Sequence, residues 1–121
     1  MSKIKSNTDL NQSKKLAEIL PLEGADMWWL YITAQGKHIA MMHEEPDPHY
    51  LARMESYGIK NAVIPCWSLT ALLDVLPSAA LDSSDDHYYR VHCMGRYTEW
   101  YDNPIDTCYE MILKLHELNL L

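Results

Sequence analysis

The chain has 121 residues, which is the length of one domain that can bury a self-sufficient core. Its 48% hydrophobic and 22% charged residues exclude a disordered chain. Ten Lys and Arg against 17 Asp and Glu give a formal charge of −7. This charge argues against sequence-independent binding to nucleic acid and against binding to an anionic membrane surface.

The N-terminus and the cysteines predict a cytoplasmic protein. The first residues, MSKIKSNTDLNQSKK, contain no apolar segment like that of a signal peptide. The longest apolar run, MWWLYI, is far shorter than the roughly 20 residues that cross a bilayer. Cys66, Cys93 and Cys108 are odd in number and lack CxxC spacing, which favours reduced thiols in a reducing compartment.

The chain begins with a predicted helix followed by a predicted hairpin. Thr8 or Asp9 can cap a helix that runs to Leu20, where a proline follows. Residues 27–34 and 37–43 are aromatic and β-branched runs around a Gly turn, which is typical of a β-hairpin.

A second helix and a weak strand are predicted next. Residues 47–57 can form a helix with Pro48 in its first turn and Gly58 just past its end. The segment NAVIP that ends at Pro65 is extended, and its proline allows an edge strand at best.

The second half of the chain repeats this order. Ser68 caps a short Leu-rich helix, a polar loop follows, and residues 87–94 and 96–101 form another hairpin around a glycine. Asp102 or Asn103 then begins the last helix. Its predicted apolar face carries Ile105, Cys108, Ile112 and Leu115.

Two similar phrases, LAEILP at 16–21 and LLDVLP at 72–77, suggest an internal duplication. We interpret residues 8–58 and 66–121 as two αββα halves of one domain spanning 1–121, with coincidence as the rival explanation. The expected fold is α+β. The two hairpins are expected to form one mainly antiparallel four-stranded sheet with helices packed on it.

Two segments, WSLTALLDVLP (67–77) and DNPIDTCYEMILKLHELNLL (102–121), resemble small uncharacterised proteins of Bacteroides-type gut bacteria and of their phages or mobile elements. NQSKKLAEILPLEGADMWW near the N-terminus is similar. The resemblance implies a bacterial or phage accessory protein. It carries over no functional residue, because the shared segments are helices and caps.

Few residues suggest catalysis or cofactor binding. His43, Glu44 and His49 form the densest group of metal ligands, yet two prolines make this segment irregular and no second ligand pair is spaced to join them. A polar connection is the favoured interpretation, and no cofactor is expected. Glu99, beside a tryptophan on a predicted strand, is the one acid that no capping role explains.

The Trp and Tyr residues offer a better candidate site. If helices cover the face of the first hairpin that carries Trp28, then Trp29 and Tyr31 lie on the open side. Tyr88 is expected to point outward from the second hairpin, and Trp100 can join it. Trp29, Tyr31, Tyr88 and Trp100 are therefore the predicted interface residues, because Trp, Tyr and Arg dominate binding energy at protein interfaces.

These patterns favour a non-catalytic cytoplasmic protein that acts through protein contacts, either as a homodimer or with a host or phage partner. One alternative is a small metal-dependent or small-molecule enzyme near His43, Glu44 and His49. Another is an acidic inhibitor of a nucleic-acid enzyme, with the acids at 82–86 docking on a basic partner.

Overall fold

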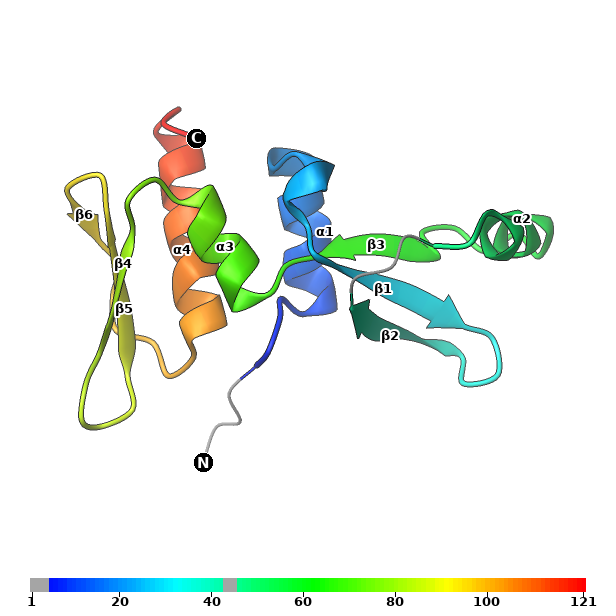
Figure 1. Cartoon of the computed structure of the whole chain (residues 1–121), viewed down its shortest axis with the longest axis horizontal. Helices are drawn as coiled ribbons and strands as arrows, with labels where there is room; N and C mark the ends of the chain where they lie inside the picture. The colour runs from blue at the N-terminus through cyan, green and yellow to red at the C-terminus, as the bar shows by residue number, and fades with distance from the viewer. Residues whose placement is uncertain (1–4, 43–45) are drawn as a thin grey trace. The chain divides into compact units, whose positions relative to one another are not determined.

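The computed structural model describes residues 5–42 and 46–121, and within them the fold is α+β with four α-helices and six strands (Figure 1). The chain forms two compact units. We call Asp9–Trp67 the N-terminal unit. The C-terminal unit is Ser68–Leu121 together with the described part of Met1–Thr8.

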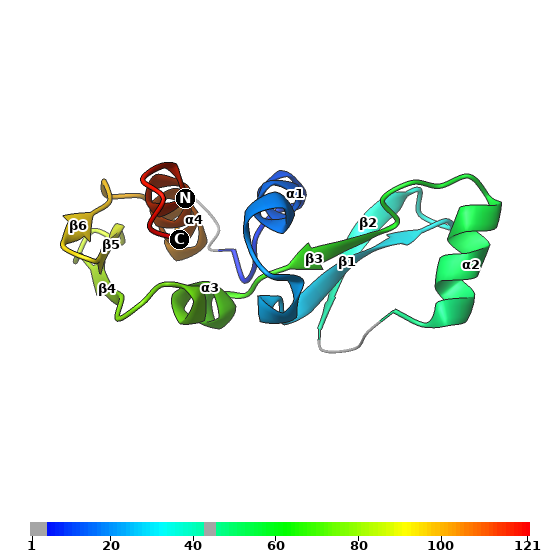
Figure 2. The same cartoon turned by 90° about the horizontal axis from the view of Figure 1, so that it is seen from above.

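The N-terminal unit holds a three-stranded antiparallel sheet in the order β2-β1-β3. Figure 2 shows α2 across the ends of β1 and β3, not over a face of the sheet. In chain order the elements are α1 (Leu10–Ile19), a 3-10 turn (Leu22–Gly24), β1 (Met27–Ile32), β2 (Lys37–Met42), α2 (Pro48–Ser56) and β3 (Val63–Cys66).

Local sequence accounts for the ends of these elements. Asp9 caps α1 and accepts a hydrogen bond from the backbone N–H of Gln12, whose side chain bonds back to the cap. Asp47 caps α2, with Pro48 at its first position. Gly36 has φ 64° in the hairpin turn, a conformation that glycine adopts at little cost. The predicted helices and the predicted hairpin of this half are confirmed.

The C-terminal unit holds a second three-stranded antiparallel sheet in the order β4-β5-β6. Ser68 caps its first helix and Asn103 its last, as predicted. The elements are α3 (Leu69–Val75), β4 (Ala80–Ser83), β5 (Tyr89–Cys93), β6 (Arg96–Tyr97) and α4 (Pro104–Glu117).

The prediction of one four-stranded sheet is wrong, because the two hairpins belong to separate sheets. Each hairpin pairs with a short strand of its own unit. β3 pairs with β1, and β4 pairs with β5, so the first strand of each hairpin is central. Both edges of the central strands are therefore already paired.

The sequence analysis did not predict β4, because the Asp and Ser residues of this strand have low β-propensity. The sequence predicts a polar loop between Pro77 and His87. Instead, Asp82 pairs with Arg90 across the ladder, and their side chains form a salt bridge of 3.1 Å. A cross-strand ion pair thus offsets a weak local preference.

The core of the C-terminal unit lies between α4 and β5. Figure 1 shows α4 running along this sheet. Val91 and Cys93 of β5 are buried, and the hydroxyl oxygen of Thr107 on α4 lies 3.4 Å from the Tyr89 carbonyl. The predicted apolar face of the last helix is confirmed, since the side chains of Ile105, Cys108, Ile112 and Leu115 are all fully buried.

The two units order their elements differently, so the internal duplication stays a prediction. The third strand follows the second helix in the N-terminal unit, whereas it precedes the hairpin in the C-terminal unit. Within the described residues, no helix is long and apolar enough to cross a membrane.

Candidate functional site

The predicted metal ligands do not form a site in the part of the chain that the structure describes. His43 and Glu44 lie outside the described residues. His49 is exposed in the first turn of α2, where its backbone N–H donates to the Asp47 carboxylate at 2.9 Å. Across residues 5–42 and 46–121, no group of three or more His, Cys, Asp or Glu side chains is placed to hold a metal ion. Glu99 is exposed.

The three cysteines are buried thiols. Burial raises the pKa of the Cys108 thiol from 9.0 to about 12, and burial also raises the pKa of Cys93. The Cys93 thiol donates to the Pro77 carbonyl at 3.3 Å. The ring of His92, the residue before it, stacks on Tyr97. Neighbouring β5 side chains point to opposite faces, so His92 cannot act as a base for Cys93.

Trp29 lies on a face of the first sheet that α1 covers. Its indole N–H donates to the hydroxyl of Ser13 in α1 at 3.1 Å, and Ser13 is fully buried. The same face carries Met27 and its β3 partner Cys66, both buried. The helix therefore covers the face opposite to the one assumed from the sequence. Trp29 is half-buried, and the helix supplies a partner for its indole N–H.

Tyr31 lies farther along β1, beside α2. Its ring makes an edge contact with the His38 ring, with 5.4 Å between centroids. Its backbone carbonyl accepts a hydrogen bond from the Tyr50 hydroxyl at 2.5 Å. Tyr31 is half-buried and lines a cavity next to α2.

The other face of the first sheet is apolar and only half-covered, which the sequence did not indicate. We call it the open apolar face, and its side chains are those of Trp28, Leu30, Ile32, Ile39, Val63 and Pro65. All six are half-exposed. MWWLYI has no polar residue on either side of the strand, so its pattern cannot say which face a helix will cover.

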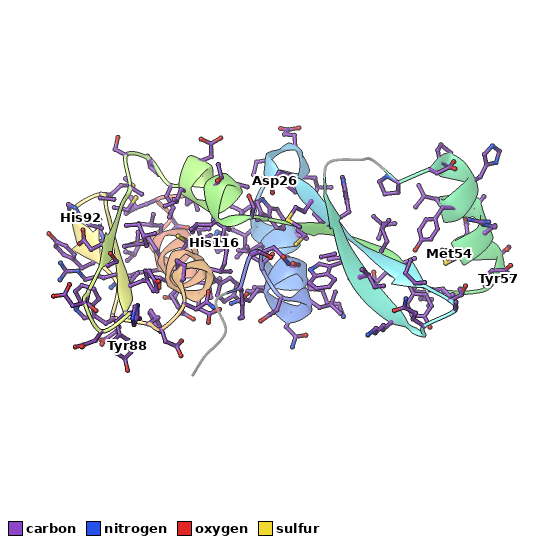
Figure 3. All side chains as sticks on the ribbon, turned by 60° about the horizontal axis from the view of Figure 1, so that its bottom comes forward. Asp26, Met54, Tyr57, Tyr88, His92 and His116 are labelled. Atoms are coloured by element: carbon purple, nitrogen blue, oxygen red, sulfur yellow. The ribbon has the colours of Figure 1, made fainter. Side chains whose placement is uncertain are left out.

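The second sheet presents aromatic rings on the face away from α4. We call this the Arg90 surface, made of Tyr88, Arg90, His92, Tyr97 and Trp100. Figure 3 shows His92 on the side of the sheet away from α4 and Tyr88 where β5 begins. The side chains of Tyr88, Tyr97 and Trp100 are 47%, 50% and 44% exposed.

Arg90 organises the Arg90 surface. Its guanidinium carbon lies 4.3 Å from the centroid of the Tyr97 ring and 4.7 Å from that of Trp100. Asp82 holds the same guanidinium through the 3.1 Å salt bridge. His92 stacks on Tyr97 with 4.4 Å between centroids and 14° between planes. Five side chains thus contact one another on this face of the sheet.

The four predicted interface residues are divided between the two sheets. Trp29 and Tyr31 lie in the N-terminal unit, whereas Tyr88 and Trp100 flank the sheet of the C-terminal unit. The sequence analysis did not identify Tyr97 as an interface residue. It predicted a strand for residues 96–101 but did not say on which face of the sheet Tyr97 lies. Its position opposite His92 in a hairpin around Gly95 is the signal that could have identified it.

Comparisons with known proteins add no family to this picture, because no family model, curated protein or solved structure matches the chain. The resemblance to proteins of Bacteroides-type bacteria therefore stays a prediction, and the candidate sites depend on their own geometry.

Proposed function

We propose that the chain is a non-catalytic protein that binds another protein through the Arg90 surface. The observation that carries this proposal is the guanidinium of Arg90 held against two exposed rings, Tyr97 and Trp100. Trp, Tyr and Arg are the residues that most often dominate the binding energy of protein interfaces.

Preorganisation strengthens this proposal. The salt bridge to Asp82 and the stack of His92 on Tyr97 restrict the side chains of the surface before any partner arrives. A partner then pays less side-chain entropy on binding than it would on a surface of mobile side chains. The ion pair supports the β4–β5 ladder and also leaves the Arg90 and Asp82 side chains 33% and 43% exposed, so a partner can reach them.

The buried thiols favour a cytoplasmic location for this protein, and the acidic charge favours a protein as its partner. Three buried cysteines suit a reducing compartment such as the cytoplasm. The formal charge of −7 makes a protein with a neutral or basic face a better partner than nucleic acid.

The test places a photo-crosslinking amino acid on the Arg90 surface. Tyr88 is exposed and aromatic, so replacing it by benzoylphenylalanine changes little else. The control carries the same residue in place of the exposed Lys114 on α4. We expect irradiation in cells of the native host to give a discrete protein adduct from position 88 and none from position 114.

A double variant then tests which residues bind. Tyr97→Ser with Trp100→Ala removes both rings that contact Arg90 while leaving the buried core intact. We expect the adduct at position 88 to disappear and the melting temperature to stay within a few degrees of the parent. An adduct that persists in the double variant, or equal adducts from both positions, would contradict the proposal.

The same experiment separates a foreign partner from a second copy of the chain. Mass spectrometry of the adduct identifies the crosslinked peptide. A peptide from this chain, together with sedimentation that depends on protein concentration and loses this dependence in the double variant, would assign the Arg90 surface to a homodimer.

A further inference from the structure

A cavity in the N-terminal unit lies where α2 crosses the ends of β1 and β3. Its volume is about 230 Å³. Figure 3 shows Met54 on the side of α2 that faces the strands and Tyr57 near the end of this helix. The cavity is lined by Tyr31, Ile32, Thr33, Tyr50, Arg53, Met54 and Tyr57.

The walls of the cavity are fixed by a tertiary hydrogen bond. The Tyr50 hydroxyl of α2 donates to the Tyr31 carbonyl of β1 at 2.5 Å and lies 3.5 Å from the Ala62 carbonyl. Met54 is almost completely buried and forms the apolar floor. The cavity is therefore part of the folded unit, with three phenol rings and the side chains of Ile32 and Met54 set around it.

One cation faces this cavity. Among the described residues, no carboxylate forms an ion pair with Arg53, which is exposed on α2. Burial raises the pKa of the Tyr50 phenol, while its hydrogen bond to the Tyr31 carbonyl and the positive charge of Arg53 oppose part of that rise. An arginine in such a position can bind a planar carboxylate with two parallel hydrogen bonds.

We propose that the cavity binds a small aromatic carboxylate, with the carboxylate on Arg53 and the ring against Tyr31, Tyr50 and Tyr57. A dry protein cavity of about 150 Å³ holds one benzene molecule, so about 230 Å³ holds one ring with a short acidic substituent. Inorganic phosphate suits the cavity less well, because Arg53 is the single cation among its lining residues.

The proposal is independent of the Arg90 surface, since all seven lining residues belong to the N-terminal unit. It also gives Tyr31 a role in the wall of a ligand site, which differs from the open interface expected from the sequence.

The probe is phenylacetate, titrated into the full chain and followed by the chemical shifts of backbone amides. Its neutral isostere, phenylacetamide, serves as the matched ligand. We expect saturable shifts that are confined to α2 and to the adjoining end of β1, and an affinity for the amide about tenfold lower, because a charge-assisted bond is lost. No saturable shift with phenylacetate, or equal affinity for the amide, would overturn the proposal.

Two variants test the residues. Arg53→Gln removes the cation from an exposed position, so the fold should persist, and we expect phenylacetate to bind about tenfold more weakly. The matched control is Lys60→Gln, which removes another exposed cation of the same unit and should leave the affinity unchanged. Equal affinity in Arg53→Gln and the parent would refute the role of Arg53.

A third variant addresses the ring wall. The side chain of Tyr57 is 65% exposed, so Tyr57→Leu removes the phenol without a loss of core packing. We expect weaker binding of phenylacetate and no change in binding of the non-aromatic acetate ion. Unchanged affinity for phenylacetate would contradict an aromatic ligand.

Discussion

The central strands of the two sheets differ in how their faces are covered. In β5, Val91 and Cys93 are buried under α4 while Arg90 and His92 face outward. In β1, Met27 alone is buried, and the five following residues are half-exposed. An alternating strand defines one inner face, whereas the continuous apolar run of β1 leaves hydrophobic side chains on both faces.

The helices that cover these strands differ as well. The 14-residue α4 buries seven side chains, whereas the ten-residue α1 buries only Ser13 and Leu16. The C-terminal unit therefore has the drier and more completely packed interior. We expect it to supply most of the stability, while the N-terminal unit keeps the open apolar face and the cavity beside α2.

The largest expected effect is the loss of stability when a core side chain of the C-terminal unit is shortened. Ile112→Ala removes a fully buried side chain of α4, and we expect the free energy of unfolding to fall by about 3 kcal/mol. The matched variant Leu30→Ala, on the open apolar face, should cost about 1 kcal/mol because this leucine is already half-exposed.

Urea unfolding, followed through amide resonances in each unit, measures both costs. Ile112→Val is a milder variant in case Ile112→Ala does not fold. Equal costs for Ile112→Ala and Leu30→Ala would break the contrast between a closed and a half-covered sheet.

Alkaline pH should weaken the C-terminal unit through Cys108. Its thiol has a pKa of about 12 in the fold against 9.0 ordinarily, so folding favours the protonated form. The contribution is complete below about pH 9 and is lost as pH rises toward about 12, and about 2 kcal/mol should be gone near pH 10.5. Urea midpoints at pH 8 and near pH 10.5 measure it. A parent and a Cys108→Ala variant with the same pH dependence would rule out this thiol as the cause.

The last comparison concerns two helix caps in different surroundings, and it includes the smallest of the expected effects. Asn103 is buried and accepts from the Ile105 N–H at 3.0 Å, so Asn103→Ala should lower the free energy of unfolding by about 2 kcal/mol. Asp47 caps α2 from an exposed position, and Asp47→Ala should cost about 0.5 kcal/mol. Thermal and urea unfolding of both variants measure the costs. A larger loss of stability for Asp47→Ala than for Asn103→Ala would contradict the view that the C-terminal unit is the more completely packed one.

Much of the local structure was determined by the sequence alone. Asp9, Ser68 and Asn103 mark the starts of helices because their side chains accept hydrogen bonds from backbone N–H groups that have no helical partner. Gly36 and Gly95 mark the hairpin turns because both have positive φ. These signals act over a few residues, so they can be read without knowing the rest of the fold.

The tertiary structure decided which strands pair and which faces are covered. β3 and β4 complete separate sheets, although Pro65 and Asp82 make them weak strands by local preference. The apolar run of β1 fits a helix on either face, and α1 covers the face on which the Trp29 indole donates to Ser13. The cavity beside α2 depends on such a long-range contact, the hydrogen bond from Tyr50 to Tyr31, whereas the Arg90 surface forms between neighbouring strands of one sheet.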